Sequence, residues 1–188
     1  MTGYAELCAT SNFTFLKGAA HPDEIVSQSA ALELDAISIT DINTFSGVVR
    51  AHATAKEIGL RFVVGTRLRF VDGTPDIICW PTDRDAYGRL CKVLTRGKRR
   101  AKKGKWILTR EDALRIGQGQ LFSVMPNDPY APAIAETLND FRAAFPTSVW
   151  LAAVRRFRDD DRRVLNQLAE TAHCTEVPLL ATNDILYH

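Results

Sequence analysis

Residues 36–67 are AISITDINTFSGVVRAHATAKEIGLRFVVGTR, and this stretch decides the fold. The apolar runs 36–40 and 62–65 have the length and composition of buried strands. Between them, residues 46–58 carry apolar side chains at helical spacing, and Gly59 follows as a helix-ending residue. A strand, a helix and a second strand in succession predict a parallel pair joined by a right-handed crossover.

The same alternation continues on both sides of this unit. Further buried strands are predicted at 77–80, 121–125, 149–154 and 178–182, and further amphipathic helices at 22–34, 86–100, 132–145 and 159–173. Pro22 in a first turn supports one helix start, and Asp83 and Asp159 are candidate caps of two others. The chain is therefore predicted to be α/β, with parallel strands and outer helices, as an open doubly wound sheet or a closed barrel.

Polar residues follow three of the predicted strands. They are 40–43 (TDIN), 65–67 (GTR) and 182–184 (TND), and the carboxyl ends of parallel strands are where such folds build their sites. Capping of the next helix by Asp and Asn is an equally good interpretation. The sequence has no glycine-rich dinucleotide fingerprint, phosphate loop or serine elbow, which leaves the common open-sheet chemistries without their motifs.

The composition indicates one globular domain. The 188 residues are 46% hydrophobic and 24% charged, which is enough to bury a core without disulfides or metals. No signal peptide and no membrane-length apolar run is recognisable, so a cytoplasmic location is expected. Cys8, Cys79, Cys91 and Cys174 are widely spaced and are predicted to be reduced thiols, mostly in or near the core.

The positive charge is concentrated in one segment. Residues 92–105 contain eight Lys and Arg and no acid, although the net charge of the chain is only +2. Candidate contacts to DNA phosphates are Lys98, Arg99, Arg100, Lys102, Lys103 and Lys105. A solvated helix end, with cations favoured near its carboxyl terminus, explains the run equally well, and a contact with protein is a third interpretation.

The opening 4–19, YAELCATSNFTFLKGA, followed by His21 and Pro22, resembles the start of the error-prone, alpha-subunit-like polymerases of the bacterial C family. Residues 36–52, 62–68, 87–105 and 179–188 match the same family in order and spacing. The resemblance implies a single PHP (polymerase and histidinol phosphatase) domain over 1–188. It implies a distorted (β/α)7 barrel that can hold up to three metal ions, and a longer parent polymerase whose palm and fingers lie beyond this chain.

The resemblance also allows the metal-ligand positions to be checked one by one. The two histidines of the first motif fall on Cys8 and Thr10, and the acid before Gly18 falls on Lys17. The next histidine falls on Ile42 and the bridging glutamate on Arg67, where a cation would repel metals. The remaining positions fall on Asp76, Arg156, Asp184 and Leu186, of which Asp184 alone is clearly kept.

These substitutions predict a degenerate site with no catalytic residue, no bound metal and no cofactor in this domain, because one carboxylate does not hold a metal cluster. His21, His52, His173 and His188 are interpreted as surface or capping groups. Lys17, Arg67 and Arg156 are expected in the former metal region, pairing with Asp41, Asp76 or Asp184. Such fixed positive charge could preserve the fold without metal or capture an anion.

The leading functional hypothesis is a structural, non-catalytic PHP domain of a translesion polymerase in DNA damage tolerance and induced mutagenesis. The parent would be a nucleotidyltransferase that needs Mg for polymerisation, and its partners would be its own later domains, DNA, mutasome accessory proteins and the sliding clamp. The first alternative is a metal-dependent phosphoesterase or 3′-5′ exonuclease built on Cys8, Asp76 and Asp184. The second is a stand-alone nucleic-acid-binding module that uses the basic run.

Overall fold

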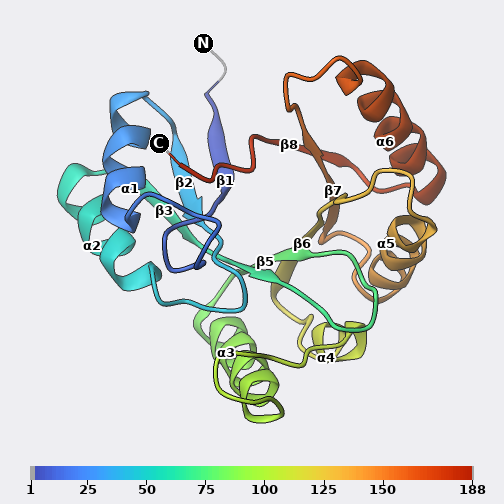
Figure 1. Cartoon of the computed structure of the whole chain (residues 1–188), viewed down its shortest axis with the longest axis horizontal. Coiled ribbons are helices and arrows are strands. Elements are labelled where there is room, and N and C mark those ends of the chain that lie inside the picture. The colour runs from blue at the N-terminus through green and yellow to red at the C-terminus, as the bar shows by residue number, and fades with distance from the viewer. Residues whose placement is uncertain (1–2, 188) are drawn as a thin grey trace. The chain divides into compact units, whose positions relative to one another are not determined.

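The structure is a computed structural model that describes residues 3–187. Helices and strands alternate along most of the chain, except that the strands β3, β4 and β5 follow one another within residues 61–81 and helix α3 is followed by α4 within residues 84–114 (Figure 1). Two compact units are present: unit 1 is formed by Met1–Arg67 and Thr182–His188, and unit 2 by Leu68–Ala181. His188 lies outside the described residues.

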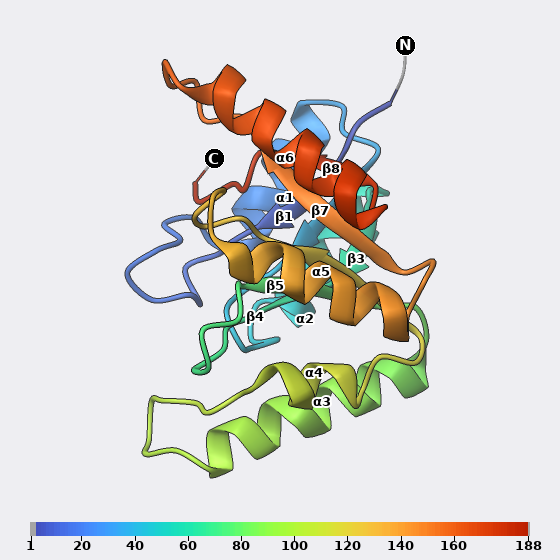
Figure 2. The same ribbon diagram turned by 90° about the vertical axis from the view of Figure 1, so that its right-hand side faces the viewer.

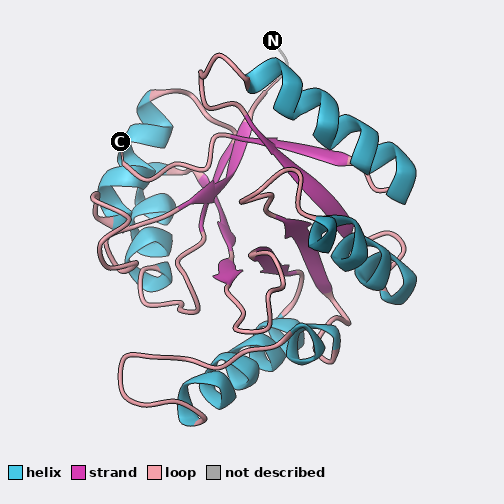
Figure 3. Ribbon diagram, turned by 45° about the vertical axis from the view of Figure 1, so that its right-hand side comes forward, coloured by secondary structure: helices cyan, strands magenta, loops and turns pink. Residues whose placement is uncertain are grey.

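Unit 1 contains a three-stranded sheet and two helices. The strands β1 (Ala5–Ala9), β2 (Ala36–Ile39) and β3 (Arg61–Val64) pair in that order, and both pairs are parallel. Helix α1 (Pro22–Ala31) connects β1 to β2, and α2 (Val48–Ile58) connects β2 to β3. The strand–helix–strand unit predicted from 36–67 is therefore confirmed (Figure 3).

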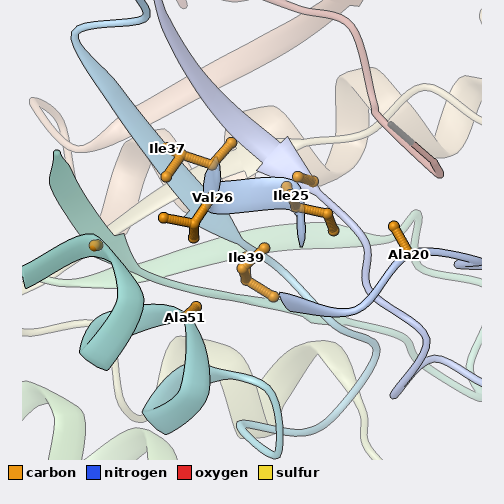
Figure 4. Close-up of a cluster of buried hydrophobic side chains, with 8 residues drawn as sticks. Ala20, Ile25, Val26, Ile37, Ile39 and Ala51 are labelled. Atoms are coloured by element: carbon orange, nitrogen blue, oxygen red, sulfur yellow. The ribbon is translucent and has the colours of Figure 1, made fainter. Parts of the chain in front are cut away.

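The core of unit 1 lies between the two helices and the sheet (Figure 4). Ile25 and Val26 of α1 pack with Ile37 and Ile39 of β2, and all four are almost fully buried. Helix α2 contributes small side chains such as Ala51, which let it approach closely. Truncation of one of the large aliphatic side chains is expected to cost about 2–5 kcal/mol.

Unit 1 is completed by two segments from elsewhere in the chain. The start of β4 (Thr66–Leu68) forms a parallel bridge between Arg67 and Ile42. Residues 182–187 run beside β1, where Ile185 bridges Ala9 and its N–H donates to the carbonyl of Cys8 at 3.0 Å. Three distant parts of the sequence therefore meet at the carboxyl end of β1.

Unit 2 contains the second sheet, of order β4-β5-β6-β7-β8, with the unit boundaries inside β4 and β8. Helices α5 and α6 lie side by side (Figure 2) and both contact β7. The bounds of the elements are β5 Ile77–Pro81, α3 Arg84–Arg99, α4 Arg110–Leu114, β6 Gln120–Val124, α5 Pro132–Ala144, β7 Val149–Val154, α6 Asp161–Thr175 and β8 Leu179–Thr182.

The prediction of uniformly parallel strands is wrong for the pair β5 and β6. Strands β6 and β7 are parallel, but β5 and β6 are antiparallel, with Pro81 opposite Gln120. The cause is the connection between them: α3 leads away from the end of β5, and α4 leads back beside it (Figure 2). The N–H of Thr82 donates to the carbonyl of Gly119 at 2.9 Å, so β6 starts where β5 ends and must run in the opposite direction.

The other expectations about the fold are partly confirmed. Pro22 occupies the first turn of α1, Gly59 ends α2 with a φ of 76°, and Asp83 caps α3 by accepting from the N–H of Ala86. Asp159 is not a cap, because α6 has Asp160 at that position. Helix α4 and strands β1 and β4 were not predicted from periodicity. The described strands form two sheets, which confirms an α/β fold with parallel strands but does not confirm a closed (β/α)7 barrel.

Candidate site at the carboxyl end of β1

Three of the nine sequence-predicted positions come together in unit 1. The Arg67 guanidinium donates through Nη2 to the Cys8 sulfur at 3.1 Å and forms an ion pair with the Asp184 carboxylate. The Cys8 thiol lies 3.4 Å from the same Asp184 oxygen, and the Thr40 hydroxyl lies 3.8 Å from Cys8 Sγ. The predicted pairing of Arg67 with Asp184 is confirmed.

Burial strengthens the electrostatic interactions among Cys8, Arg67 and Asp184. The side chains of Arg67 and Asp184 are only 6% and 14% exposed. Burial raises the pKa of the Cys8 thiol to about 12 and the Asp184 charge adds to this, although Arg67 acts in the opposite direction. Burial by itself would lower the pKa of the Arg67 guanidinium, yet Cys8 and Asp184 hold it above its ordinary value. Arg67 is therefore a permanent cation beside a neutral thiol.

A second buried carboxylate, Glu6 of β1, fastens the 182–184 segment to the sheet. Its two oxygens accept from the Cys8 N–H and the Asn183 N–H, each at 2.8 Å. They also accept from the hydroxyls of Tyr4 and Thr182. Burial and this contact with Glu6 raise the pKa of Tyr4. Glu6 thereby positions the neighbouring Asp184 for its contact with Arg67.

The buried Asp41 carboxylate accepts hydrogen bonds from the loop that follows β1. One carboxylate oxygen accepts from the Ser11 N–H at 2.9 Å and the Thr14 hydroxyl at 2.7 Å, and the other accepts from the Ser11 hydroxyl at 2.7 Å. Burial raises the pKa of Asp41, and these hydrogen bonds oppose the rise. Asp41 therefore organises the loop after β1, and within unit 1 its carboxylate is bound by Ser11 and Thr14 and not by the predicted cations Lys17 or Arg67.

The other predicted cations and acids are Lys17 in unit 1 and Asp76 and Arg156 in unit 2. Lys17 is exposed on the loop after β1. In unit 2, the Asp76 carboxylate forms a bidentate ion pair with the Arg69 guanidinium, with contacts of 2.7 and 3.1 Å. The cation that pairs with Asp76 is therefore Arg69, which was not among the predicted partners. Arg156 is exposed and lines a cavity of about 280 Å³ together with Tyr130 and Arg158.

The residues present do not fit a divalent metal cluster. Thr10 is buried and its N–H donates to the carbonyl of Ile185, Ile42 bridges Arg67 through its backbone, and Leu186 is partly exposed. The cation Arg67 already occupies the space between the carboxylate of Asp184 and the sulfur of Cys8. Within residues 3–187, no group of three or more His, Cys, Asp or Glu is arranged to hold a metal ion.

The described histidines, and the cysteines other than Cys8, occupy helix-capping, surface or core positions. His21 precedes α1 as its N-cap residue, and its N–H donates to the Glu24 carboxylate at 2.7 Å. His52 and His173 are exposed on α2 and α6. All four cysteines are free, and Cys79 is buried like Cys8. Cys91 is half-buried and Cys174 is exposed, so the expectation that most of the thiols lie in or near the core is confirmed, with Cys174 as the exception.

The basic run forms the end of α3 and the turn that follows. Lys98 and Arg99 lie in the last turn of α3 and are exposed. Arg100 differs from its neighbours because it pairs with the Asp112 carboxylate at 2.6 Å, and this contact holds the pKa of Asp112 below its ordinary value against the effect of burial. Lys102, Lys103 and Lys105 are exposed in the turn.

Sequence reasoning missed Glu6 and Arg69. An acid in the middle of the apolar strand AELCA was the available signal for Glu6, since a buried carboxylate requires several donors. For Arg69, the signal was the opposite charge of Asp76 across a short turn. Neither residue occupies one of the nine ligand positions. Glu6 accepts hydrogen bonds that join 182–183 to β1, and Arg69 supplies the counter-charge for the buried Asp76 carboxylate.

The chain matches the model of a known protein family. The model of the PHP domain matches residues 7–129. None of the helices within 3–187 is long and apolar enough to cross a membrane.

Curated relatives of this chain are error-prone DNA polymerases. The protein of Brucella abortus is 46% identical over 100% of this chain, that of Rhodopseudomonas palustris 44% over 98%, and that of Caulobacter vibrioides 42% over 98%. The chain spans only 17–18% of the length of these relatives and matches their amino-terminal part.

Solved structures share the fold at low sequence identity. An amidohydrolase of Chromobacterium violaceum, with bound sulfate and no metal, has a TM-score of 0.71 at 17% identity over 98% of this chain and 88% of its own. A two-domain protein of Bacteroides vulgatus that contains a PHP-like metal-dependent phosphoesterase has a TM-score of 0.67 at 12% identity, over 97% and 52%. At such identities the likeness establishes the fold alone.

Proposed function

This chain belongs to the PHP domain family, and we propose that it is the non-catalytic, structural PHP domain of an error-prone polymerase in translesion synthesis. In this role it acts in DNA damage tolerance and induced mutagenesis. The parent is a DNA-directed DNA polymerase that needs Mg for polymerisation elsewhere in its chain. The high identity to error-prone DNA polymerases over the whole chain supports the assignment.

The ion pair between Arg67 and Asp184 is the observation that carries the non-catalytic part of the proposal. A PHP phosphoesterase needs metal ions to polarise a phosphodiester and to generate hydroxide near neutral pH. Arg67 supplies fixed positive charge but cannot ionise a water molecule or release a coordination site. We infer that the guanidinium does the structural work of a metal ion, joining β4 to the 182–184 segment.

The rest of the proposal concerns the parent protein. Its PHP domain comprises residues 1–188, closes into a distorted (β/α)7 barrel and supports the polymerase core in the cytoplasm. Its partners are the later domains of the same chain, DNA through the parent, mutasome accessory proteins and the sliding clamp. Each is an inference from the family of relatives and not from a residue of this chain.

A nuclease assay tests the loss of catalysis. The purified chain is incubated with a 5′-labelled primer in Mn²⁺ or Zn²⁺, beside Asp184→Ala and the exposed control Asp159→Ala. We expect the same background release of nucleotides for all three proteins. Metal-dependent release that Asp184→Ala abolishes and Asp159→Ala retains would establish the phosphoesterase or 3′-5′ exonuclease alternative instead.

The structure also favours a second candidate function, binding of the DNA backbone by the basic turn. The N–H of Lys105 donates to the carbonyl of Lys102 at 3.0 Å, and Gly104 has a φ of 81°, as in a type II turn. The base of the turn is fixed, because Leu108 packs so closely on Gly97 that a Cβ there would lie 2.5 Å from its Cδ2. Three exposed ammonium groups are therefore presented on a firm support.

The salt dependence of DNA binding tests this candidate. Replacement of Lys102, Lys103 and Lys105 by Gln should reduce the slope of log K against log salt by about 2–3 on duplex DNA, because each phosphate contact contributes about 0.9. The matched control Lys56→Gln/Arg61→Gln/Arg84→Gln also removes three exposed cations and should change the slope by less than about 1. Equal slopes for the two variants would reject the basic turn as a DNA contact.

A further inference from the structure

The loop after β1 presents an apolar tip to solvent. Three large hydrophobic side chains within four residues, Phe13, Phe15 and Leu16, are 45%, 84% and 88% exposed. Figure 2 shows the loop extending between β1 and α1. Contiguous exposed apolar groups on a protein surface mark sites of interaction more often than isolated ones do. We call these three residues the apolar tip.

The loop that carries the apolar tip is tightly held. Buried Asp41 accepts three hydrogen bonds from Ser11 and Thr14, and the Thr14 hydroxyl accepts from the Ile42 N–H at 3.0 Å. The N–H groups of Lys17 and Gly18 both donate to the carbonyl of Thr14. The exposure of the apolar tip is consequently imposed by an ordered backbone and is not a feature of a loose segment.

Two backbone features show that the loop is held in an unfavourable conformation. Leu16 has a φ of 63°, in the left-handed region that non-glycine residues avoid. At Gly18 the loop closes so tightly that a Cβ would lie 2.1 Å from the carbonyl oxygen of Ser11. Within the described residues Leu16 buries little surface in return for this strain. Strain that is retained at an exposed position indicates a functional constraint.

We propose that the apolar tip docks against the polymerase part of the same protein. The proposal rests on the proposed function, in which this chain is one domain of a longer polymerase. More than four fifths of the length of the curated relatives lies outside the match, so most of the surface that this domain would meet is absent here. Lys17 is the only cation in the loop 11–18, so the apolar tip lacks the basic face that binds anionic lipid.

Thiol labelling tests the docking directly. In a Cys174→Ser background, which removes the exposed native thiol, Phe15→Cys places a thiol in the apolar tip. Val49→Cys on α2 is the matched control, because Val49 is 79% exposed and lies outside the loop. A maleimide is reacted with the isolated chain and with the full-length protein. Labelling of the peptide that carries the engineered thiol is followed over time by mass spectrometry.

We expect the Phe15→Cys thiol to react at least about tenfold more slowly in the full-length protein than in the isolated chain, while the Val49→Cys thiol differs little. A second variant, Phe15→Ser/Leu16→Ser, should lower the thermal midpoint of the full-length protein and leave that of the isolated chain unchanged, because both side chains are exposed in it.

Equal reaction rates of the Phe15→Cys thiol in the two proteins would overturn the docking proposal. A labelling rate of the isolated chain that decreases as its concentration is raised would also overturn the proposal, since the apolar tip would then contact a second copy. Primer extension by the full-length protein separates the two proposals. If it extends primers but leaves the apolar tip reactive, the docking proposal fails and the polymerase assignment stands.

Discussion

Substitution of Arg67 by Met is predicted to destabilise the chain strongly. The change removes the buried cation that pairs with the Asp184 carboxylate, which is only 14% exposed, and keeps most of the side-chain volume. Removal of one partner of a buried ion pair costs about 3–5 kcal/mol. The residual exposure of Asp184 lets water reach the carboxylate, so the lower end of the range, about 3 kcal/mol, is expected.

The assay is urea unfolding followed by both fluorescence and circular dichroism, since coincident transitions justify a two-state free energy of unfolding. The double variant Arg67→Met/Asp184→Asn removes both charges and should recover to within about 1–2 kcal/mol of the wild type. Arg115→Met, which breaks an exposed pair with Glu111, is the matched control and should cost less than about 0.5 kcal/mol.

Two results would refute this reasoning. A loss below about 1 kcal/mol for Arg67→Met would mean that the ion pair does not support the fold. A double variant no more stable than the single one would mean that Asp184 is not left with an unpaired charge. By contrast, recovery in the double variant would identify the pair as the coupled unit.

Three other predictions concern Glu6, Cys79 and Gly18. Glu6→Gln should cost about 2–4 kcal/mol in urea unfolding, because the new amide cannot accept at both ends from the four donors around Glu6; a change within error would contradict the role of Glu6. Burial raises the pKa of the Cys79 thiol, so the stability that this thiol contributes is complete below the unfolded-state pKa of about 8.5. As pH rises further it is lost by at most about 1.4 kcal/mol per pH unit. The free energy of unfolding of Cys79→Ala should therefore fall less steeply at alkaline pH than that of the wild type, and identical pH profiles would reject this role of Cys79. Gly18→Ala should lower the thermal midpoint by several degrees through its clash with Ser11, whereas an unchanged midpoint would show that the loop yields easily.

Local sequence patterns were sufficient to predict most helices and strands of this fold. The segment 36–67 determined a parallel unit because a helix between two buried strands leaves few alternatives. The same logic failed between β5 and β6, where 38 residues hold two helices and not one. Periodicity could not find α4, because a helix of five residues has too few positions to display a face.

The candidate site was predicted less completely, and the reasons are local. The pairing of Arg67 with Asp184 followed from their positions at two strand ends. The partners of Asp41 and Asp76 did not follow, because hydroxyl groups of Ser11 and Thr14 and the nearby cation of Arg69 satisfy them at lower cost than distant charges would.

The metal content of the purified chain tests the central claim most directly. The chain is prepared without chelators or a histidine tag, dialysed against manganese, zinc and iron, and then analysed by elemental mass spectrometry. With Arg67 beside Asp184 and Cys8, we expect fewer than about 0.1 tightly held ions per chain. One or more ions per chain, retained through dialysis, would contradict the metal-free account.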